Sequence, residues 1–93
     1  MIGEIAVVPQ APGPAREIVT KAVDEIAAQG LRYHVEATGT SVEGELEPIL
    51  AAVRAITERL GAEGVDRAVI ELRLQLEPHG ETLEHQVEGI ERR

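Results

Sequence analysis

The residues best suited to binding chemistry lie in one short segment, 31–44, which combines carboxylates, hydroxyls and a histidine. Residues 31–38 alternate like a strand, and the following Gly39-Thr40 predicts a hairpin turn in which the glycine supplies a positive φ. With that turn, Glu36 would face Glu43, and two facing carboxylates destabilise a hairpin by up to about 1 kcal/mol. A cationic or hydrogen-bond-donating ligand would explain this pair, and so would a neighbouring arginine.

The candidate ligand-binding residues are the polar and aromatic side chains of this segment: Tyr33, His34, Glu36, Thr38, Thr40, Ser41 and Glu43. Each also has a purely structural interpretation. Alternation places Tyr33 on the side that faces the helices, where it would pack in the core; the alternative is that its hydroxyl lies at a pocket edge. The histidine and the hydroxyls would be ordinary strand and turn residues. Arg32 and Arg73 could neutralise the two carboxylates, and a one-residue change of register would also separate them.

Composition narrows the function classes. The 93 residues correspond to one domain, 1–93, and the net charge of −8 argues against a phosphate-backbone partner. Tyr33 is the only aromatic residue, so a base-stacking platform for nucleic acid is not expected. Without cysteine there is no thiolate nucleophile, disulfide or cysteine-ligated metal. The short apolar runs and the absence of a signal-like start predict a cytoplasmic protein that does not span a membrane.

No pattern in the chain indicates catalysis or a bound cofactor. No nucleophile–base pair is visible, and His79 and His85 lack the spacing of a metal site. We therefore expect no catalytic residue, metal or cofactor, and a protein that is not an enzyme.

The first half of the chain predicts a strand, a helix and then the hairpin. Residues 2–8 are apolar and β-branched, and Pro9 ends them. Pro14 suits the first position of a helix, and apolar residues then recur with helical spacing up to residue 26. Gly30 follows where a left-handed cap is needed.

The second half predicts a helix, a strand and a last helix. Pro48 opens a helix whose apolar stripe reaches Leu60, and Gly61 and Gly64 close it. Residues 67–76 alternate between apolar and polar, as in a strand with one buried face. Thr82 can cap a short final helix that carries Leu83, Val87 and Ile90.

This order predicts an α+β ferredoxin-like sandwich, βαββαβ, in which two helices cover one face of a four-stranded antiparallel sheet. A short C-terminal helix would follow it. The other face would carry these polar residues: Glu4, Arg32, His34, Glu36, Thr38, Glu43, Glu71 and Arg73. The fold by itself leaves the function open, because this sandwich hosts many chemistries.

Four segments resemble a family of small ferredoxin-like proteins, the thiamine-binding-protein-like family. They are Val7-Val8-Pro9, the hairpin Gly39-Thr40-Ser41-Val42-Glu43-Gly44, the strand entry Gly64-Val65-Asp66-Arg67-Ala68-Val69 and the tail Thr82-Leu83-Glu84-His85-Gln86-Val87. Their order and spacing cover the chain. The chain departs from the family at Thr57, where a histidine is common, and at Ala37-Thr38, where many members have Pro-Met.

The resemblance implies non-catalytic binding of thiamine or its hydroxymethyl-aminopyrimidine precursor, in homodimers or homotetramers. A carboxylate with hydroxyls can match an aminopyrimidine edge, and a carboxylate also suits a positive thiazolium. An alternative interpretation is an ACT-like regulatory or interaction module that binds an amino acid or a partner protein, since Pro12-Gly13 follows the first strand as in that fold.

Overall fold

The structure, a computed structural model, describes residues 1–10 and 14–76. Its elements are β1 (Ile2–Pro9), α1 (Ala15–Ala28), β2 (Arg32–Val35), β3 (Thr40–Glu43), α2 (Leu46–Ala62) and β4 (Ala68–Gln75). The final helix expected from Thr82 lies outside the described residues. No helix in the described part of the chain is both long and apolar enough to cross a membrane.

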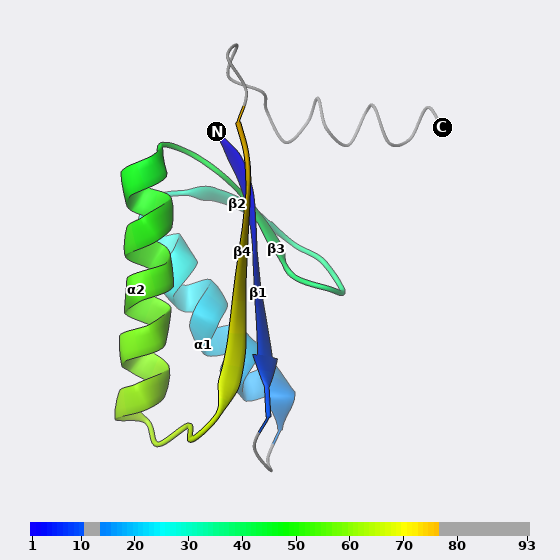
Figure 1. The fold of residues 1–93 in the computed structure, drawn as a ribbon, viewed down its shortest axis with the longest axis vertical. Helices are drawn as coiled ribbons and strands as arrows, with labels where there is room; N and C mark the ends of the chain where they lie inside the picture. Colours follow the sequence, from blue (N-terminus) through cyan, green and yellow to red (C-terminus); the bar gives the residue numbers. More distant parts are fainter. Residues whose placement is uncertain (11–13, 77–93) are drawn as a thin grey trace.

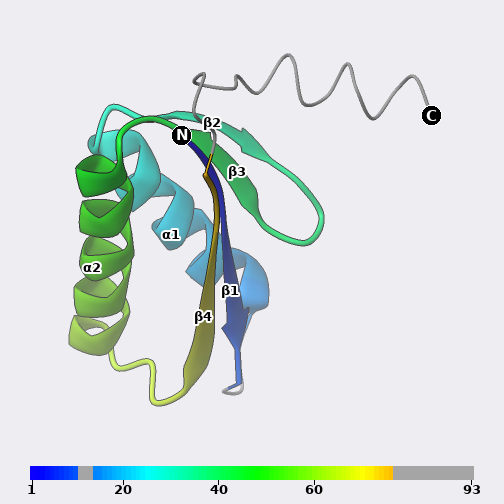
Figure 2. The ribbon, with the colours of Figure 1, turned by 45° about the horizontal axis from the view of Figure 1, so that its top comes forward.

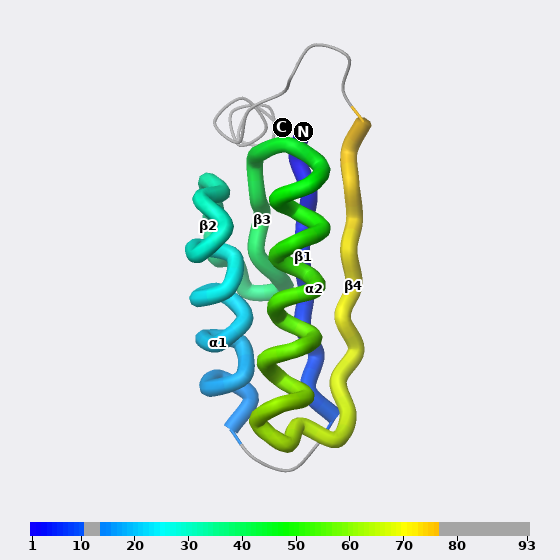
Figure 3. Tube along the Cα trace, turned by 90° about the vertical axis from the view of Figure 1, so that its left-hand side faces the viewer, coloured from blue at the N-terminus to red at the C-terminus, as the bar shows by residue number. Residues whose placement is uncertain are grey.

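The strands form one antiparallel sheet in the order β2-β3-β1-β4, and both helices lie on the same face of it (Figures 1 and 2). Central β1 pairs with β3 and β4, so that Ile5 lies opposite Thr40 on one side and Leu72 on the other. This is the ferredoxin-like sandwich that the sequence predicts. The layers are offset: Figure 3 shows α1 in front of β2 and α2 in front of β1 and β3, with β4 to one side of both helices.

Proline and glycine mark the helix ends close to their expected positions. Pro14 is the residue before α1 rather than its first residue, and Gly30 follows the helix with a φ of 75°. Helix α2 begins at Leu46, so Pro48 occupies its first turn, where a missing N–H leaves no hydrogen bond unmade. Gly64 follows α2 with a φ of 78°.

The core lies between the helices and the sheet and is built of aliphatic side chains. Ile26, Val42, Ile49 and Ile56 are its largest fully buried side chains. Full burial of such a side chain contributes about 1.5–3 kcal/mol. These contacts hold β1 and β3 against the helices, and so they fix the strands whose other side forms the open face.

The hairpin has a different register from the one expected. Arg32 lies opposite Glu43, and the Glu36 N–H donates to the Gly39 carbonyl at 2.8 Å. The turn therefore contains Ala37 and Thr38 instead of Gly39 and Thr40. The predicted opposition of Glu36 and Glu43 is wrong, because this register places an arginine opposite Glu43.

Gly39 is also needed for a different reason from the one expected. Gly30 and Gly64 have positive φ, whereas Gly39 and the other described residues do not. A Cβ at Gly39 would lie 3.2 Å from the Ile5 carbonyl oxygen and 3.3 Å from Glu4 Cγ. The glycine therefore lets the start of β3 approach β1 closely.

Candidate functional site

The candidate site is the open face of the sheet, opposite the helices. Directly paired residues project from the same side of a sheet. His34 pairs with Ser41, Ser41 with Glu4, and Glu4 with Arg73, so these four side chains form one row across the four strands. The sheet thus gathers a carboxylate, a hydroxyl, an imidazole and a guanidinium on one surface.

A second row runs beside it, and we call it the acid-flanked row: Glu36, Gly39, Ala6 and Glu71. Glu71 pairs with Ala6, and a Cβ at Gly39 would lie 3.4 Å from that of Ala6. Two small residues therefore occupy the middle of the sheet, with a carboxylate on each outer strand. A flat ligand could approach the sheet closely above these small residues.

Two side-chain interactions tie the hairpin together on this face. Arg32 Nη1 lies 3.8 Å from Glu43 Oε2, and the Ser41 hydroxyl donates to Glu36 Oε1 at 3.1 Å. Of the two arginines that could neutralise the hairpin carboxylates, Arg32 therefore pairs with Glu43. Glu36 instead accepts a hydrogen bond from the Ser41 hydroxyl. In Figures 1 and 2, the hairpin tip leans away from the helices and so borders the open side.

The structure brings four of the seven predicted site residues to this face: His34, Glu36, Ser41 and Glu43. Thr40 does not share it, because it pairs with Ile5 on the helix side and is only 4% exposed. Tyr33 also lies on the helix side, opposite Val42, but it is 43% exposed and is not a core residue. Thr38 lies at the exposed turn.

Glu4, Glu71 and Arg73 also belong to this surface and were not among the predicted site residues. The signal that could have included them was available, because alternation along the first and last strands already placed them on the open face. The predicted set followed the hairpin alone, whereas the site is built across four strands.

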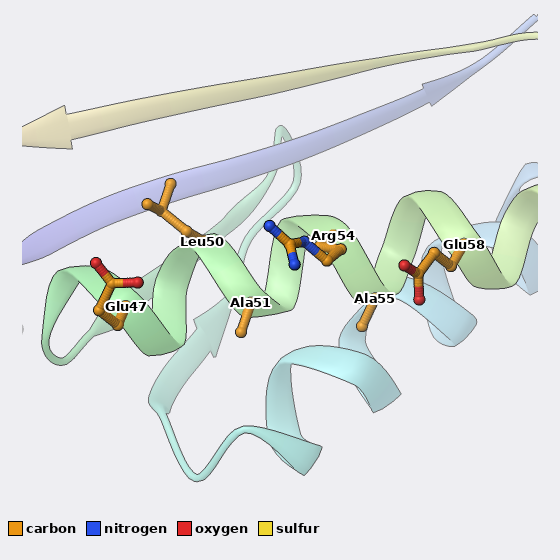
Figure 4. Close-up of a pocket in the computed structure, with 6 residues that line it drawn as sticks. All are labelled: Glu47, Leu50, Ala51, Arg54, Ala55 and Glu58. Atoms are coloured by element: carbon orange, nitrogen blue, oxygen red, sulfur yellow. The ribbon is translucent and has the colours of Figure 1, made fainter.

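A separate hollow of about 280 Å³ lies on the outer side of α2 (Figure 4). Its lining residues are Glu47, Leu50, Ala51, Arg54, Ala55 and Glu58. Figure 4 shows the two alanines pointing away from β1 and β4, and all lining residues belong to α2, so this hollow is remote from the open face. It contains none of the predicted site residues.

Solved structures of similar proteins share the fold over most of their length. A hypothetical protein from Methanocaldococcus jannascii is 29% identical, with a TM-score of 0.83 and coverage of 97% of this chain and 94% of that one. A protein from Thermotoga maritima, provisionally assigned to thiamine biosynthesis or salvage, is 30% identical, with a TM-score of 0.84 and 96% coverage of both chains.

A domain of unknown function from Bacillus cereus is 28% identical, with a TM-score of 0.81 and coverage of 92% of this chain and 85% of that one. A comparison with curated proteins found no match. The sequence profile of the family described as thiamine-binding protein matches residues 3–91. The chain therefore belongs to the thiamine-binding protein family.

Proposed function

We propose that this protein binds thiamine or its hydroxymethyl-aminopyrimidine precursor on the open face of the sheet, without catalysing a reaction on it. The observation that carries this proposal is the acid-flanked row in a member of the thiamine-binding protein family. The similarity to the Thermotoga maritima protein supports the same ligand class.

The acid-flanked row suits a flat, positively charged ligand. A ring lying over Gly39 and Ala6 would have Glu36 on one side and Glu71 on the other. Carboxylates accept hydrogen bonds from an exocyclic amine and attract a positive ring, and a hydrogen bond to a charged group contributes about 1.5–3 kcal/mol. His34 and Ser41, in the neighbouring row, would contact the substituents of the ring.

One open sheet face lacks the walls of a pocket, and small-molecule sites usually enclose most of the ligand. We therefore propose that the protein forms a homotetramer, or failing that a homodimer, in which a second subunit closes the site. Facing sheets related by a twofold axis would set the arginines of one subunit near the carboxylates of the other. Light scattering during size exclusion tests the assembly, and a monomer of 10.0 kDa at micromolar concentration would contradict it.

Calorimetry with thiamine, hydroxymethyl-aminopyrimidine and a panel of amino acids tests the ligand. We expect saturable binding of one of the first two and none of the amino acids. Binding of an amino acid alone would favour the ACT-like alternative instead. Mass spectrometry of the ligand after incubation tests the absence of catalysis, because any conversion that depends on the protein would refute it.

A further inference from the structure

Four exposed leucines lie where the start of α2 and the end of β4 reach the same end of the molecule (Figure 1). We call them together the leucine patch: Leu46 and Leu50 on α2, Leu74 on β4, and Leu76 just after it. Their side chains are 38%, 41%, 39% and 85% exposed, respectively. Leu46 and Leu50 lie one turn apart on α2, and Figure 4 shows Leu50 pointing toward the strands. Alternation from Leu72, which packs on the core, places Leu74 and Leu76 on the helix side of β4.

The patch exists because the two helices do not cover the whole sheet. Arg59 contacts α1, which shows that the opposite flank of α2, where Leu46 and Leu50 lie, faces away from that helix. Figure 3 shows β4 to the side of both helices. Large apolar side chains exposed on both α2 and β4 suit the packing of a third helix beside α2.

The chain itself supplies a segment of the right kind at this place. Strand β4 ends at Gln75, and residues 77–93 continue directly from Leu76, which belongs to the patch. Leu83, Val87 and Ile90 recur with helical spacing behind Thr82. Such a short helix is stable only when its apolar stripe packs on another surface.

The leucine patch suits this segment better than the open face does. The large apolar side chains exposed on the open face are Val8 and Val69, at the opposite end of β4 from Leu76. That face also carries four carboxylates, on Glu4, Glu36, Glu43 and Glu71, against two arginines, and residues 77–93 contain five glutamates against two arginines. Like charges repel, so the open face disfavours this segment.

We propose that residues 82–91 dock as an amphipathic helix on the leucine patch of their own chain, with Leu83, Val87 and Ile90 against Leu46, Leu50 and Leu74. The docked segment adds a third helix to the layer and leaves the open face accessible. This arrangement is independent of the proposed ligand.

Disulfide trapping tests the contact cleanly because the chain contains no cysteine. The test pair is Leu50→Cys with Val87→Cys, and the matched control pair is Val69→Cys with Val87→Cys. Under mild oxidation we expect the test pair to close within one chain at least ten-fold faster than the control pair, read by non-reducing gel and intact mass. Equal rates, no closure of the test pair, or closure mainly between two chains would each overturn the proposal; the last outcome would assign the patch to a second copy.

A second readout avoids engineered cysteines. A glutamate-specific protease should cleave after Glu84 and Glu88 several-fold faster in Leu50→Gln than in the wild type, because the segment loses its apolar contact. Val69→Gln is the matched control on the open face and should leave the cleavage rate unchanged. Equal cleavage in Leu50→Gln and the wild type would contradict docking at this patch.

Discussion

The seam between α1 and α2 and the open face of the sheet differ in how many of their charged side chains form ion pairs. In the seam, Arg59 reaches three carboxylates, those of Glu63 at 2.9 Å, Asp24 at 3.5 Å and Glu25 at 3.6 Å. Lys21 on α1 also pairs with Glu63, which directly follows α2. On the open face, Glu4 and Arg73 are cross-strand neighbours, yet no ion pair joins them or Glu71 to another described residue.

This difference in pairing indicates what the charged groups of each region do. The seam charges pair with one another and link two helices that already share a buried core. On the open face, Arg32 and Glu43 pair within the hairpin, whereas Glu4, Glu71 and Arg73 have no ion pair with another described residue. The hydrogen-bonding capacity of these three side chains is available to a ligand or a second subunit. Changes under the helices should therefore act on stability, and changes on the open face should act on binding.

The largest expected effect is on stability, from Ile56→Ala in the buried layer under α2. Ile56 is fully buried, and removing such a side chain leaves a cavity that costs about 2–5 kcal/mol. Urea unfolding would measure the loss. Val69→Ala, on the exposed open face, is the control and should stay within about 0.5 kcal/mol of the wild type. Similar losses in both variants would abolish the distinction between the two regions.

The next effect is on binding, from Glu71→Gln in the acid-flanked row of the open face. It should weaken the binding of thiamine or the aminopyrimidine by about 1–3 kcal/mol in calorimetry, because a charged hydrogen bond is lost. Its effect on stability should stay below about 0.5 kcal/mol, since Glu71 is exposed. Glu47→Gln on α2 is the matched control, and unchanged affinity in Glu71→Gln would remove this residue from the site.

The hairpin shows how far the sequence alone could lead. Alternation correctly placed His34, Glu36 and Glu43 on one face, because the side-chain period of a strand depends only on the local backbone. It could not give the register, since Gly39 looked like a turn residue while its actual constraint comes from β1, more than thirty positions earlier in the chain.

The fold was easier to predict than the site for a related reason. The order of strands and helices follows from local periodicity and from Pro14, Gly30 and Gly64, and it indicated the sandwich correctly. The site needs side chains from four strands at once, including Glu4 and Arg73, and those neighbours depend on the strand order and pairing. A prediction centred on the hairpin therefore found only part of the open face.

Replacing Gly39 or Gly61 by alanine should change the stability by smaller amounts, and in opposite directions. Gly39→Ala should destabilise the protein by about 1 kcal/mol, because its Cβ would press against the backbone of β1 at the hairpin. Gly61→Ala should stabilise it by about 0.5 kcal/mol, since it lies in α2 with open space around the added Cβ. Urea unfolding of both variants measures the difference, and a stabilising Gly39→Ala would show that β1 yields easily.

The smallest expected effect is the pH dependence of the seam. Hydrogen bonds from Lys21 and then Arg59 hold the pKa of Glu63 below its ordinary value. The bond to Glu63 in turn raises the pKa of Arg59, so the guanidinium stays charged throughout. The ionised Glu63 therefore stabilises the fold fully above its ordinary pKa of about 4.3, and this contribution disappears as the pH falls through its lowered folded pKa.

Glu63→Gln removes that ionisation and tests the sign. Its melting temperature should lie slightly below that of the wild type at neutral pH, and the gap should close as the pH falls below about 4. Glu58→Gln, exposed on α2 but outside the seam, should show no comparable gap at either pH. A gap that widens toward acid would mean that Glu63 is not stabilised in its charged form, and the paired charges of the seam would then no longer distinguish it from the open face.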